Sequence, residues 1–332
     1  MKVIITHWVH EEVTTFLRFF AEVKAPTASG EVWPKDRVLQ EAADADAVIT
    51  SMADSVDEAF LKACANLKIV AATLKGYDNY DVEACTRHGV VLTIVPDIII
   101  PPTAELAVSL ALGIIRNVRQ GDETVRSGEF TAWRPLHYGM SLCGATVGFI
   151  GMGNLGQAIA QLLSPFGIAR MLYYDQSEQD PPEHWTGPAW EKVDLRTVLS
   201  SCDICIVSLP LTSSTHHLLD GQALKGLRSG AYMVNIGRGS VLDENAVLDA
   251  LNERRLAGYA ADVFEFEDWA LPSRPKEISA ALRQHPRTLF TPHLGSAVDS
   301  LRREMSMKAA EQVRAVLAGE TPEFAVNTAK KA

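Results

Sequence analysis

The sequence predicts an α/β protein built on two parallel β-sheets, each covered by helices on both faces. Two observations predict this class. Short apolar runs rich in β-branched residues alternate with segments of helical spacing, first across residues 1–95 and again from residue 146 onward. A proline-rich stretch at 95–102 interrupts the alternation, which suits a crossing between domains. The 332 residues, 47% of them hydrophobic, suffice for two such cores.

The first half supplies the first β-α series. The strand-like runs are 2–7, 46–52, 67–74 and 90–95, and the helical segments between them are 11–21, 56–65 and 82–89. A long helix is expected from about Thr103 to Arg119, with Thr103 as its N-cap. The stretch 126–144 has no clear period and is expected to be a loop.

The second half repeats the pattern. Strands are expected at 146–151, 170–175, 203–210, 230–237, 258–264 and 288–293, and helices at 155–167, 194–202, 244–255 and 300–319. The polar, proline-rich stretch 176–190 is expected to be a loop.

The bulk composition excludes several classes of function. The net charge is −10 and the sequence pI is about 5.4, so the general field favours neither nucleic acid nor an anionic membrane. The longest apolar stretch, 106–115, is shorter than the roughly 18 residues of a membrane span and is expected to be a core helix. The N-terminus becomes charged too early for a signal peptide, which indicates a cytoplasmic protein.

The five cysteines indicate neither a disulfide framework nor a metal site. Their number is odd, and although Cys202 and Cys205 form a CxxC, Cys205 lies in an apolar strand-like run. No second CxxC or histidine pair completes a zinc site, so packing cysteines and no metal are expected.

A dinucleotide-binding motif lies at the start of the second series. Gly151, Gly153 and Gly156 form G-x-G-x-x-G between a strand and a helix, and about 20 residues on, Asp175 ends the next strand. The three glycines allow a tight turn, close approach of the pyrophosphate, and close packing of helix on strand. Because Asp175 would bind the ribose hydroxyls and repel a 2′-phosphate, and Gln176 rather than arginine follows, NAD is expected over NADP unless a neighbouring cation offsets Asp175.

Three ionisable residues follow apolar strands downstream of this motif: Arg238, Glu265 and His293. Each should emerge at the carboxyl edge of the parallel sheet, where open α/β sheets bind ligands. A histidine oriented by a carboxylate is a general base near neutral pH, and an arginine can clamp an oxyanion. Singly, each residue could equally be a loop histidine, a surface charge or a capping cation.

The runs "GFIGMGNLG", "VNIGRGSVLDENAVLDAL", "GYAADVFE" and "TPHLGSA" resemble the D-2-hydroxyacid dehydrogenase superfamily. The resemblance implies a flavodoxin-like substrate domain from 1–100 and 299–332, a Rossmann NAD-binding domain at 101–298, an active site in the cleft between them, and a homodimer through the NAD-binding domain. It implies that the cofactor is contacted by Gly151, Gly153, Asn154, Leu155, Gly156, Asp175, Gln176, Thr103, Pro210, Arg238, Asp262 and His293.

Further segments resemble one branch of that superfamily, the phosphite (phosphonate) dehydrogenases. They are "SMADS" at 51–55, "LKGYDNYD" at 74–81, 95–105, 126–139 and 262–275. The resemblance implies oxidation of phosphite to phosphate with hydride transfer to NAD. The catalytic residues would be Lys75, Arg238, Glu265 and His293, and the other substrate-binding candidates are Gly76, Met52, Trp133, Tyr138, Ser296 and Arg302.

Charge considerations agree with this implication. Phosphite is a small dianion, so it needs more positive charge than a monocarboxylate, and Lys75, Arg238 and Arg302 would supply it. His293, held by Glu265, is expected to act as the base, with Arg238 acting on water as the alternative.

Two other interpretations stay open. The first is a 2-oxo acid reductase of the superfamily, acting on glyoxylate or hydroxypyruvate, which would not need Lys75. The second is an NAD-sensing regulator without catalysis, which would have no need of the arginine, glutamate and histidine. Met52 could instead fill the core, Trp133 and Tyr138 could pack a loop, and Arg302 could lie on a solvated face.

Overall fold

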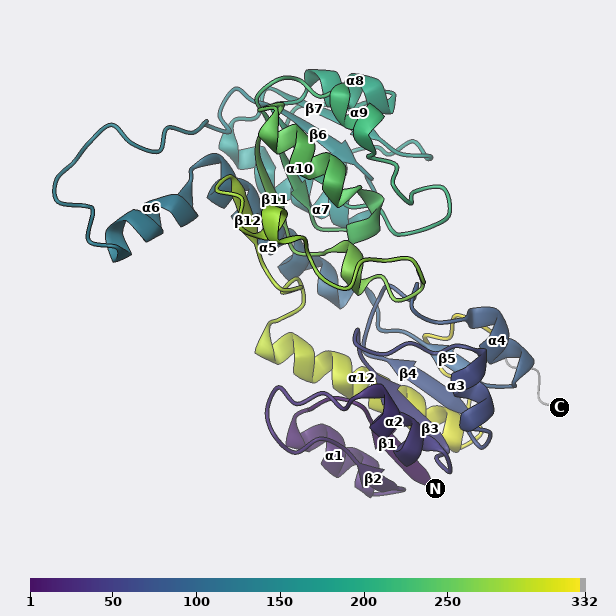
Figure 1. Cartoon of the computed structure of the whole chain (residues 1–332). Coiled ribbons are helices and arrows are strands. Elements are labelled where there is room, and N and C mark those ends of the chain that lie inside the picture. Colours follow the sequence, from purple (N-terminus) through teal and green to yellow (C-terminus); the bar gives the residue numbers. More distant parts are fainter. Residues whose placement is uncertain (329–332) are drawn as a thin grey trace. The chain divides into compact units, whose positions relative to one another are not determined.

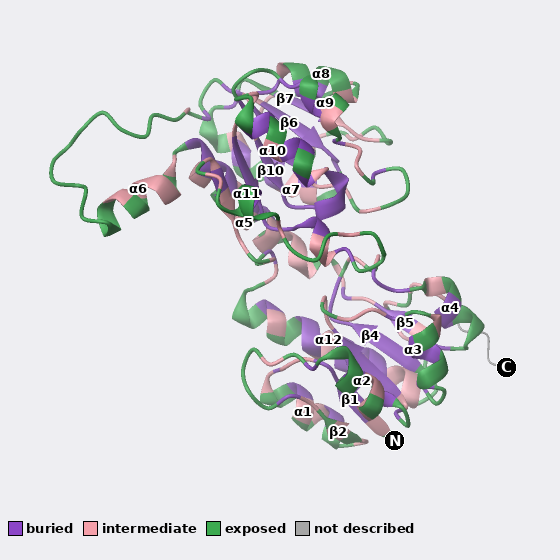
Figure 2. Ribbon diagram, in the orientation of Figure 1, coloured by how far each residue is buried: buried purple, intermediate pink, exposed green. Residues whose placement is uncertain are grey.

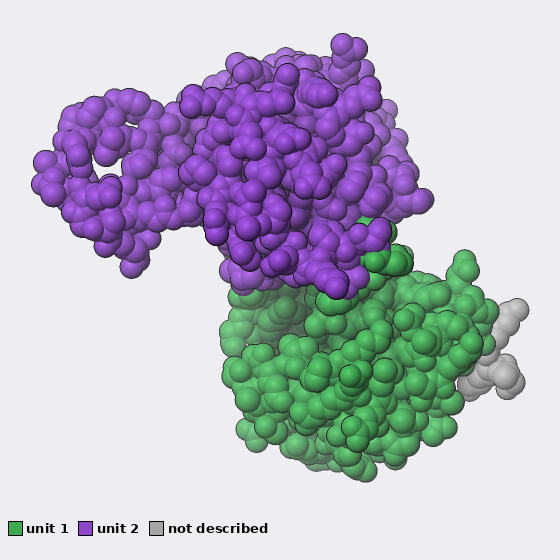
Figure 3. Space-filling model, viewed as in Figure 1, with its two compact units in different colours: residues 1–99, 269–272, 296–332 green, residues 100–268, 273–295 purple. Residues whose placement is uncertain are grey.

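The computed structural model describes residues 1–328, which divide into two compact units (Figure 3). Unit 1 consists of Met1–Ile99, Trp269–Pro272 and the segment from Ser296 onward, and unit 2 consists of Ile100–Asp268 and Ser273–Gly295. The sequence predicts domain boundaries after residues 100 and 298, and the corresponding boundaries between the units fall after Ile99 and Gly295. The last four residues of the predicted segment 299–332 lie outside the described part of the chain.

Unit 1 holds a five-stranded sheet in the order β2-β1-β3-β4-β5, with all neighbouring strands parallel (Figure 1). Its strands are β1 Lys2–Ile5, β2 Glu22–Lys24, β3 Ala47–Thr50, β4 Ile69–Ala72 and β5 Val91–Thr93. Its helices are α1 Glu11–Arg18, α2 Lys35–Ala42, α3 Glu58–Ala63, α4 Val82–Arg87 and α12 Asp299–Leu317, with the short 3-10 helix η1 at Asp97–Ile99.

Burial in unit 1 follows from the sequence. Strands β3 and β4 are buried at every position, as expected for central strands of a parallel sheet covered on both faces (Figure 2). Helices α3 and α4 begin at Asp57 and Asp81, whose carboxylates accept backbone N–H bonds from Phe60 and Ala84 as N-caps.

Unit 2 holds a seven-stranded parallel sheet in the order β12-β11-β10-β9-β6-β7-β8. Its strands are β6 Thr146–Ile150, β7 Arg170–Tyr174, β8 Trp190–Lys192, β9 Ile204–Val207, β10 Ala231–Asn235, β11 Leu256–Ala261 and β12 Thr288–Phe290. Its helices are α5 Ile100–Ile115, α6 Val118–Arg126, α7 Asn154–Leu163, α8 Leu195–Ser201, α9 Gly221–Lys225, α10 Glu244–Asn252 and α11 Ala280–Arg283. The 3-10 helices are η2 Ser164–Phe166, η3 Gly239–Val241 and η4 Glu265–Glu267.

The strand order of unit 2 reverses direction between β6 and β9, and this switch point determines where a ligand binds. From β6 the chain runs outward through β7 and β8, and from β9 it runs the other way through β10, β11 and β12. Open parallel sheets bind ligands outside the carboxyl ends of the strands at such a point. The predicted fold class, two doubly wound parallel sheets with a Rossmann nucleotide-binding domain, is confirmed.

The long helix predicted over 103–119 is wrong at both ends. Helix α5 starts at Ile100 and has Pro101 and Pro102 in its first turn, where proline costs no hydrogen bond. Thr103 therefore lies inside the helix and is not its N-cap. The helix ends at Ile115, and Asn117, in the left-handed region at φ 51°, separates it from α6.

Helix α6 and the segment 127–139 form an arm that projects from the rest of unit 2 (Figure 1). The segment 127–139 has no helix or strand, as predicted for the 126–144 loop. The arm exposes large apolar side chains: Val118, Val125, Phe130, Trp133, Leu136 and Tyr138.

The predicted loop 176–190 is wrong at its end. Trp190 starts the edge strand β8 and pairs with Met171 of β7. Trp190 is the only apolar residue of this strand and follows a proline-rich run, so no apolar run marks the strand in the sequence.

Within the described residues, one helical stretch, Asp97–Ile115, has the length and apolar composition to cross a membrane. Ala104, Ala107, Leu110 and Ile114 on this stretch are buried in a core cluster of unit 2, as expected for a core helix. Cys202 and Cys205 are likewise buried in a core cluster, which agrees with their predicted role in packing.

Candidate active site

The turn between β6 and α7 has the backbone geometry of a pyrophosphate-binding loop. Gly151 has φ 98°, which side chains rarely adopt. A Cβ on Gly156 would lie 2.5 Å from the carbonyl oxygen of Gly151, so the helix packs against the turn only because this residue is glycine. A Cβ on Gly153 would meet nothing within 4 Å, so the space in front of the helix N-terminus is open. A dinucleotide phosphate fits this arrangement.

Asp175 follows β7 and is tied to the same turn. Its Oδ2 accepts a hydrogen bond of 2.7 Å from the backbone N–H of Met152, and its Oδ1 accepts one of 3.1 Å from Ser177. The carboxylate is thus held at the carboxyl edge where an adenosine ribose is expected. Lys192 donates from Nζ to the carbonyl oxygen of Gln176 at 3.2 Å, so a cation lies close to the residue after Asp175.

The remaining predicted cofactor residues of the switch point lie on the same edge of unit 2. Asn154 and Leu155 are the first residues of α7, and Pro210 follows β9. Ser208, also after β9, donates its hydroxyl to the carbonyl oxygen of Gly151 at 2.9 Å, which joins the two loops across the switch point.

His293 is paired with a carboxylate, and that carboxylate belongs to Glu267. The Nδ1 of His293 lies 2.7 Å from Oε2 of Glu267. The prediction that Glu265 holds His293 is therefore wrong. Glu265 lies 3.0 Å from Nε2 of His217 through its own Oε2. Because the two glutamates occupy the ends of the 3-10 turn η4, their side chains leave it in different directions.

The loop that carries His293 is anchored by Asp262, the residue after β11. The carboxylate of Asp262 accepts hydrogen bonds from the hydroxyl of Thr291 at 2.6 Å and from the backbone N–H groups of Leu294 and Gly295 at 2.7 and 2.9 Å. Burial raises the pKa of the Asp262 carboxyl. Predicted as a cofactor contact, Asp262 thus has both oxygens engaged in positioning the histidine loop.

The same loop is held from a second side. The hydroxyl of Thr103 in α5 donates to the carbonyl oxygen of Gly295 at 3.1 Å. His293 has φ 55°, a left-handed conformation that costs energy for a residue with a side chain. Strained residues held by several hydrogen bonds are common at functional sites, which agrees with the predicted importance of His293.

Arg238 follows β10 and occupies an extended backbone conformation with φ −137°. Its guanidinium donates to the carbonyl oxygen of Gly237 at 3.0 Å. The side-chain amide of Asn235 donates to the carbonyl oxygen of Arg238 at 3.0 Å, and its side-chain oxygen accepts from the backbone N–H of Gly237. Asn235 therefore holds the loop that carries Arg238. Arg238, Glu267 and His293 all emerge at the carboxyl edge of unit 2, since each follows a strand of its parallel sheet.

Unit 1 carries a second group of predicted site residues at its own carboxyl edge. Lys75 and Gly76 follow β4 and Met52 follows β3. The Nζ of Lys75 lies 2.6 Å from Oδ1 of Asp97, and the lysine side chain is 45% exposed. Met52 packs partly buried against a core cluster, so the structure gives it the core-filling role as well.

Arg302 is half-buried near the start of α12. Burial lowers the pKa of its guanidinium. Burial and then the charge of Arg302 lower the pKa of His7 to about 4, so His7, which follows β1, lies near this arginine and is neutral at physiological pH. Unit 1 therefore brings Arg302 to an edge with His7, a residue that the sequence analysis did not select.

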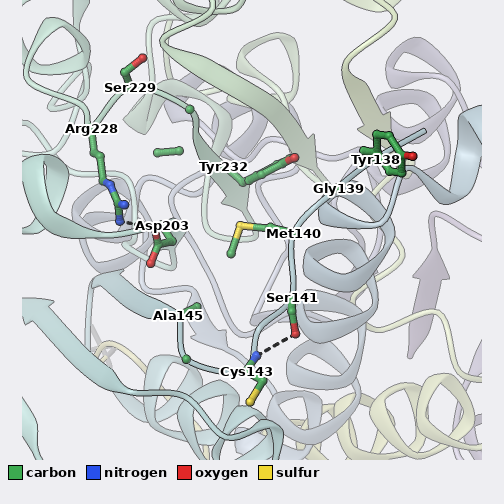
Figure 4. A pocket seen from close by; sticks show the side chains of 13 residues that line it. Tyr138, Gly139, Met140, Ser141, Cys143, Ala145, Asp203, Arg228, Ser229 and Tyr232 are labelled. Carbon is green, nitrogen blue, oxygen red and sulfur yellow. Dashed lines mark hydrogen bonds and ion pairs between the residues drawn. The ribbon is translucent and has the colours of Figure 1, made fainter. Parts of the chain in front are cut away.

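The remaining substrate candidates lie elsewhere. Trp133 and Tyr138 are each 81% exposed on the arm. Tyr138 borders a cavity of about 410 Å³ (Figure 4). The cavity is also lined by Ala145, Asp203 and Tyr232, at the amino ends of β6, β9 and β10. Since His293 lies at the carboxyl edge, the structure does not bring Tyr138 to His293 of its own chain. Ser296 begins the last segment of unit 1.

Sequence reasoning missed Glu267 and His217. The run "EFE" offers two carboxylates two residues apart, and without the turn geometry nothing decides which one reaches His293. His217 follows a threonine-rich segment with no strand period. Among residues 1–328, no group of three histidine, cysteine, aspartate or glutamate side chains could hold a metal ion.

Comparison with known proteins covers nearly the whole chain. A family model described as "D-isomer specific 2-hydroxyacid dehydrogenase, NAD binding domain" matches residues 108–295. A glyoxylate reductase of Thermococcus litoralis is 34% identical over 98% of this chain and 96% of its own length. A glyoxylate reductase of Pyrococcus furiosus is 35% identical over 98% and 95%. The crystal structure of the TT0316 protein of Thermus thermophilus matches with a TM-score of 0.86 at 30% identity, over 98% of this chain and all of that one.

The fold, the glycine loop and these matches define an NAD-dependent dehydrogenase. Within that class, the chain belongs to the D-isomer specific 2-hydroxyacid dehydrogenase family. The predicted superfamily and the predicted cofactor, NAD, are confirmed. The matches carry nothing specific to phosphite, and the names of the relatives favour the alternative prediction of a 2-oxo acid reductase.

Proposed function

We propose that this enzyme transfers hydride between NAD and a small anionic substrate, with His293 as the acid–base group and Arg238 as the anion-binding group. The observation that carries the proposal is the contact of 2.7 Å between His293 and Glu267, on a loop fixed by Asp262. When bound, NAD supplies the hydride acceptor or donor.

Each residue has a distinct task in this proposal. Glu267 accepts a hydrogen bond from Nδ1 of His293, which leaves Nε2 to exchange a proton with the substrate oxygen. The carboxylate also stabilises the imidazolium that forms when alcohol is oxidised. Arg238 offers a planar donor group that matches a carboxylate or another oxyanion in two parallel hydrogen bonds.

The first candidate substrate is a small 2-oxo acid of the glyoxylate or hydroxypyruvate class, reduced to the 2-hydroxy acid. The printed names of the relatives support this candidate. In this reaction hydride goes to the carbonyl carbon and His293 gives its proton to the carbonyl oxygen. Because the substrate is a monocarboxylate, a single arginine suffices to bind it.

The second candidate is phosphite, oxidised to phosphate while NAD is reduced. The specific observation in its favour is Lys75, a cation at the end of β4 within the run "LKGYDNYD", which resembles the substrate loop of phosphite dehydrogenases. A dianion needs more than one cation, and Lys75 with Arg302 at the edge of unit 1 would add to Arg238. Either His293 or Arg238 would then act on the attacking water.

One experiment separates the candidates. Purified protein is assayed for NADH formation with NAD and phosphite, with phosphate release in parallel, and for NADH consumption with glyoxylate and hydroxypyruvate. Phosphate and NADH appearing together, with loss on Lys75→Ala, support phosphite. Activity confined to the 2-oxo acids and indifferent to Lys75→Ala supports the first candidate. The matched control is Lys62→Ala, an exposed lysine of unit 1 that pairs with Glu58.

Binding of NADH without turnover of any of these substrates would contradict both candidates and leave the NAD-sensing regulator. NADH fluorescence titration is therefore measured beside the assays. A further check is His293→Asn, which should abolish turnover and leave NADH binding within about threefold, because the imidazole acts on the substrate.

We also propose that the enzyme is a homodimer that acts in the cytoplasm. The exposed apolar side chains of the arm, Phe130, Trp133 and Leu136 among them, support a contact with a second copy. All five cysteines are free thiols, which supports a reducing compartment. Sedimentation velocity of the intact chain and of a Phe130→Ser, Leu136→Ser variant tests the dimer, since a monomeric intact chain would contradict it.

A further inference from the structure

A second histidine–carboxylate pair shares the turn η4 with the candidate catalytic one. Nε2 of His217 lies 3.0 Å from Oε2 of Glu265, and only one residue separates Glu265 from Glu267, the partner of His293. One turn of 3-10 helix, η4, thus carries two carboxylates, each directed to a different histidine. The mechanism proposed above uses only one of them.

Glu265 is also tied to the start of helix α10 by a reciprocal pair of hydrogen bonds. The backbone N–H of Glu244 donates to Oε1 of Glu265 at 2.7 Å, and the backbone N–H of Glu265 donates to Oε1 of Glu244 at 2.9 Å. Both glutamates are 8% exposed. Buried carboxylates are retained only where hydrogen bonds offset their desolvation, so both oxygens of Glu265 serve to fix the turn.

The same cluster holds the loop of Arg238. The backbone N–H of Ser240 donates to Oδ2 of Asp268 at 2.7 Å, and the backbone N–H of His217 donates to the carbonyl oxygen of Ser240 at 2.7 Å. Gly239 lies directly against the backbone of Phe264 and Glu265, where a Cβ would overlap them. The loops after β10 and β11 are therefore in backbone contact. A movement of η4 would displace both loops.

His217 itself is held in an uncommon conformation. Its φ is 50°, in the left-handed region, and its ring stacks on that of His216 with centroids 4.1 Å apart and planes 16° apart. Two contacts hold this conformation: the backbone N–H of His217 donates to Ser240, and the ring contacts Glu265. A histidine fixed in this way is suited to positioning a neighbour.

We propose that His217 and Glu265 are positioning residues, which hold the η4 turn so that Glu267 meets His293. The inference rests on the proposed function, because it assigns His293 and Glu267 the chemistry. Burial raises the pKa of Glu244 to about 7, and the charges of the neighbouring carboxylates of Glu265, Asp268 and Glu267 add to the effect. The raised pKa agrees with several carboxylates packed close together around η4. The groups that face Glu244 are these three carboxylates and Tyr259, with His217 beyond Glu265.

The test compares two substitutions of Glu265. Glu265→Ala removes both contacts, and kcat is expected to fall about tenfold with KM changed less than about threefold, as for a displaced acid–base group. Glu265→Gln keeps an oxygen for the N–H of Glu244 and an amide for His217, so kcat should recover to within about threefold of wild type. An equal loss in both variants would mean that the charge of Glu265 matters and not its hydrogen bonds, which overturns the proposal.

A double-mutant cycle shows whether Glu265 acts through Glu267. In a Glu267→Ala background, Glu265→Ala should cause no further loss of kcat, because the contact with His293 that it supports is already gone. Losses that multiply would show an independent role and contradict the proposal. Glu253→Ala, at an exposed glutamate of the same unit that pairs with Arg255, is the control and should leave kcat unchanged.

Two further measurements keep the inference testable if Glu265→Ala does not fold or if no substrate turns over. His217→Asn suits the left-handed backbone and removes only the ring contact with Glu265, so it should lower kcat as Glu265→Ala does, and by no more. The downfield Nδ1–H proton resonance of His293, identified by its loss in Glu267→Ala, should broaden in His217→Asn and persist in Glu265→Gln. An unchanged resonance in His217→Asn would refute positioning, whether or not the proposed reaction is correct.

Discussion

The Nδ1 atom of His293 lies 2.7 Å from Oε2 of Glu267, and the chemistry proposed for unit 2 rests on this contact. The hydrogen bond fixes the orientation of the imidazole and leaves Nε2 toward a ligand. The loop is further held by Asp262, whose carboxylate accepts three hydrogen bonds from residues 291–295. The proposed acid–base group thus lies on a loop that these hydrogen bonds hold in place.

The first prediction concerns Glu267. Glu267→Gln should lower kcat about 100-fold or more, because the neutral amide no longer stabilises the imidazolium. The affinity for NADH should stay within about threefold, since Glu267 contacts His293 and the backbone N–H of Phe264 and not the glycine loop. Steady-state kinetics and NADH fluorescence measure the two quantities. A variant with full kcat would exclude Glu267 from the mechanism.

The second prediction separates two glycines of the nucleotide loop. A Cβ at Gly156 would lie 2.5 Å from a backbone oxygen, so Gly156→Ala should lower the free energy of unfolding by about 1–3 kcal/mol. A Cβ at Gly153 would meet no protein atom, so Gly153→Ala should keep wild-type stability and weaken NADH binding about tenfold or more. Thermal denaturation and NADH titration of both variants provide the comparison. Equal stability of the two would refute the packing argument.

The third prediction concerns the choice of cofactor. Asp175 is held by the N–H groups of Met152 and Ser177, with its charge where a 2′-phosphate would lie. Asp175→Ala should raise the ratio of kcat/KM for NADP to that for NAD about tenfold, since it removes a repulsion of about 1 kcal/mol or more. Lys192, 3.2 Å from the carbonyl oxygen of Gln176, is the cation that would bind the added phosphate.

The control for this prediction is the double variant Asp175→Ala, Lys192→Ala. It should lose most of the gain in NADP use, whereas Lys192→Ala alone should leave kcat/KM for NAD within about twofold. A gain for NADP that is indifferent to Lys192 would show that the lysine serves only to tether the loop.

The sequence predicted the architecture well because the central strands are apolar at every position. Strands β3, β4 and β9 are buried throughout, so their runs are unbroken and easy to recognise. Strands β2 and β8 were missed because each has a single apolar residue among charged ones, so no apolar run marks either strand. Helix α5 was misread at its start because Pro101 and Pro102 suggest a loop, although both fit a first helical turn.

The candidate site was predicted less completely because its partners are set by turns and not by periods. His293 and Arg238 were found because each follows an apolar strand. Glu265 was selected because it follows an apolar strand, and only the 3-10 geometry of η4 directs Glu267 to His293 and Glu265 to His217. The pairing of Lys75 with Asp97 joins residues 22 positions apart, for which the sequence holds no signal.

The last prediction concerns the pH dependence of stability. Burial raises the pKa of Glu244 from its ordinary 4.5 to about 7 in the folded protein. Between these values the folded state binds more protons than the unfolded state, so stability from this group is full below about pH 4.5 and is lost as the pH rises through about 7. The loss is at most about 3.5 kcal/mol, at about 1.4 kcal/mol for each pKa unit.

Glu244→Gln removes this dependence, because the amide keeps an oxygen for the N–H of Glu265 and never ionises. The variant should therefore gain stability over wild type as the pH rises from 5 to 8, by about 1–3 kcal/mol at the upper end. Urea unfolding of both proteins at fixed protein concentration across this range measures the difference, with Glu253→Gln as an exposed control. Parallel curves for wild type and Glu244→Gln would contradict a raised pKa of Glu244 in the folded protein.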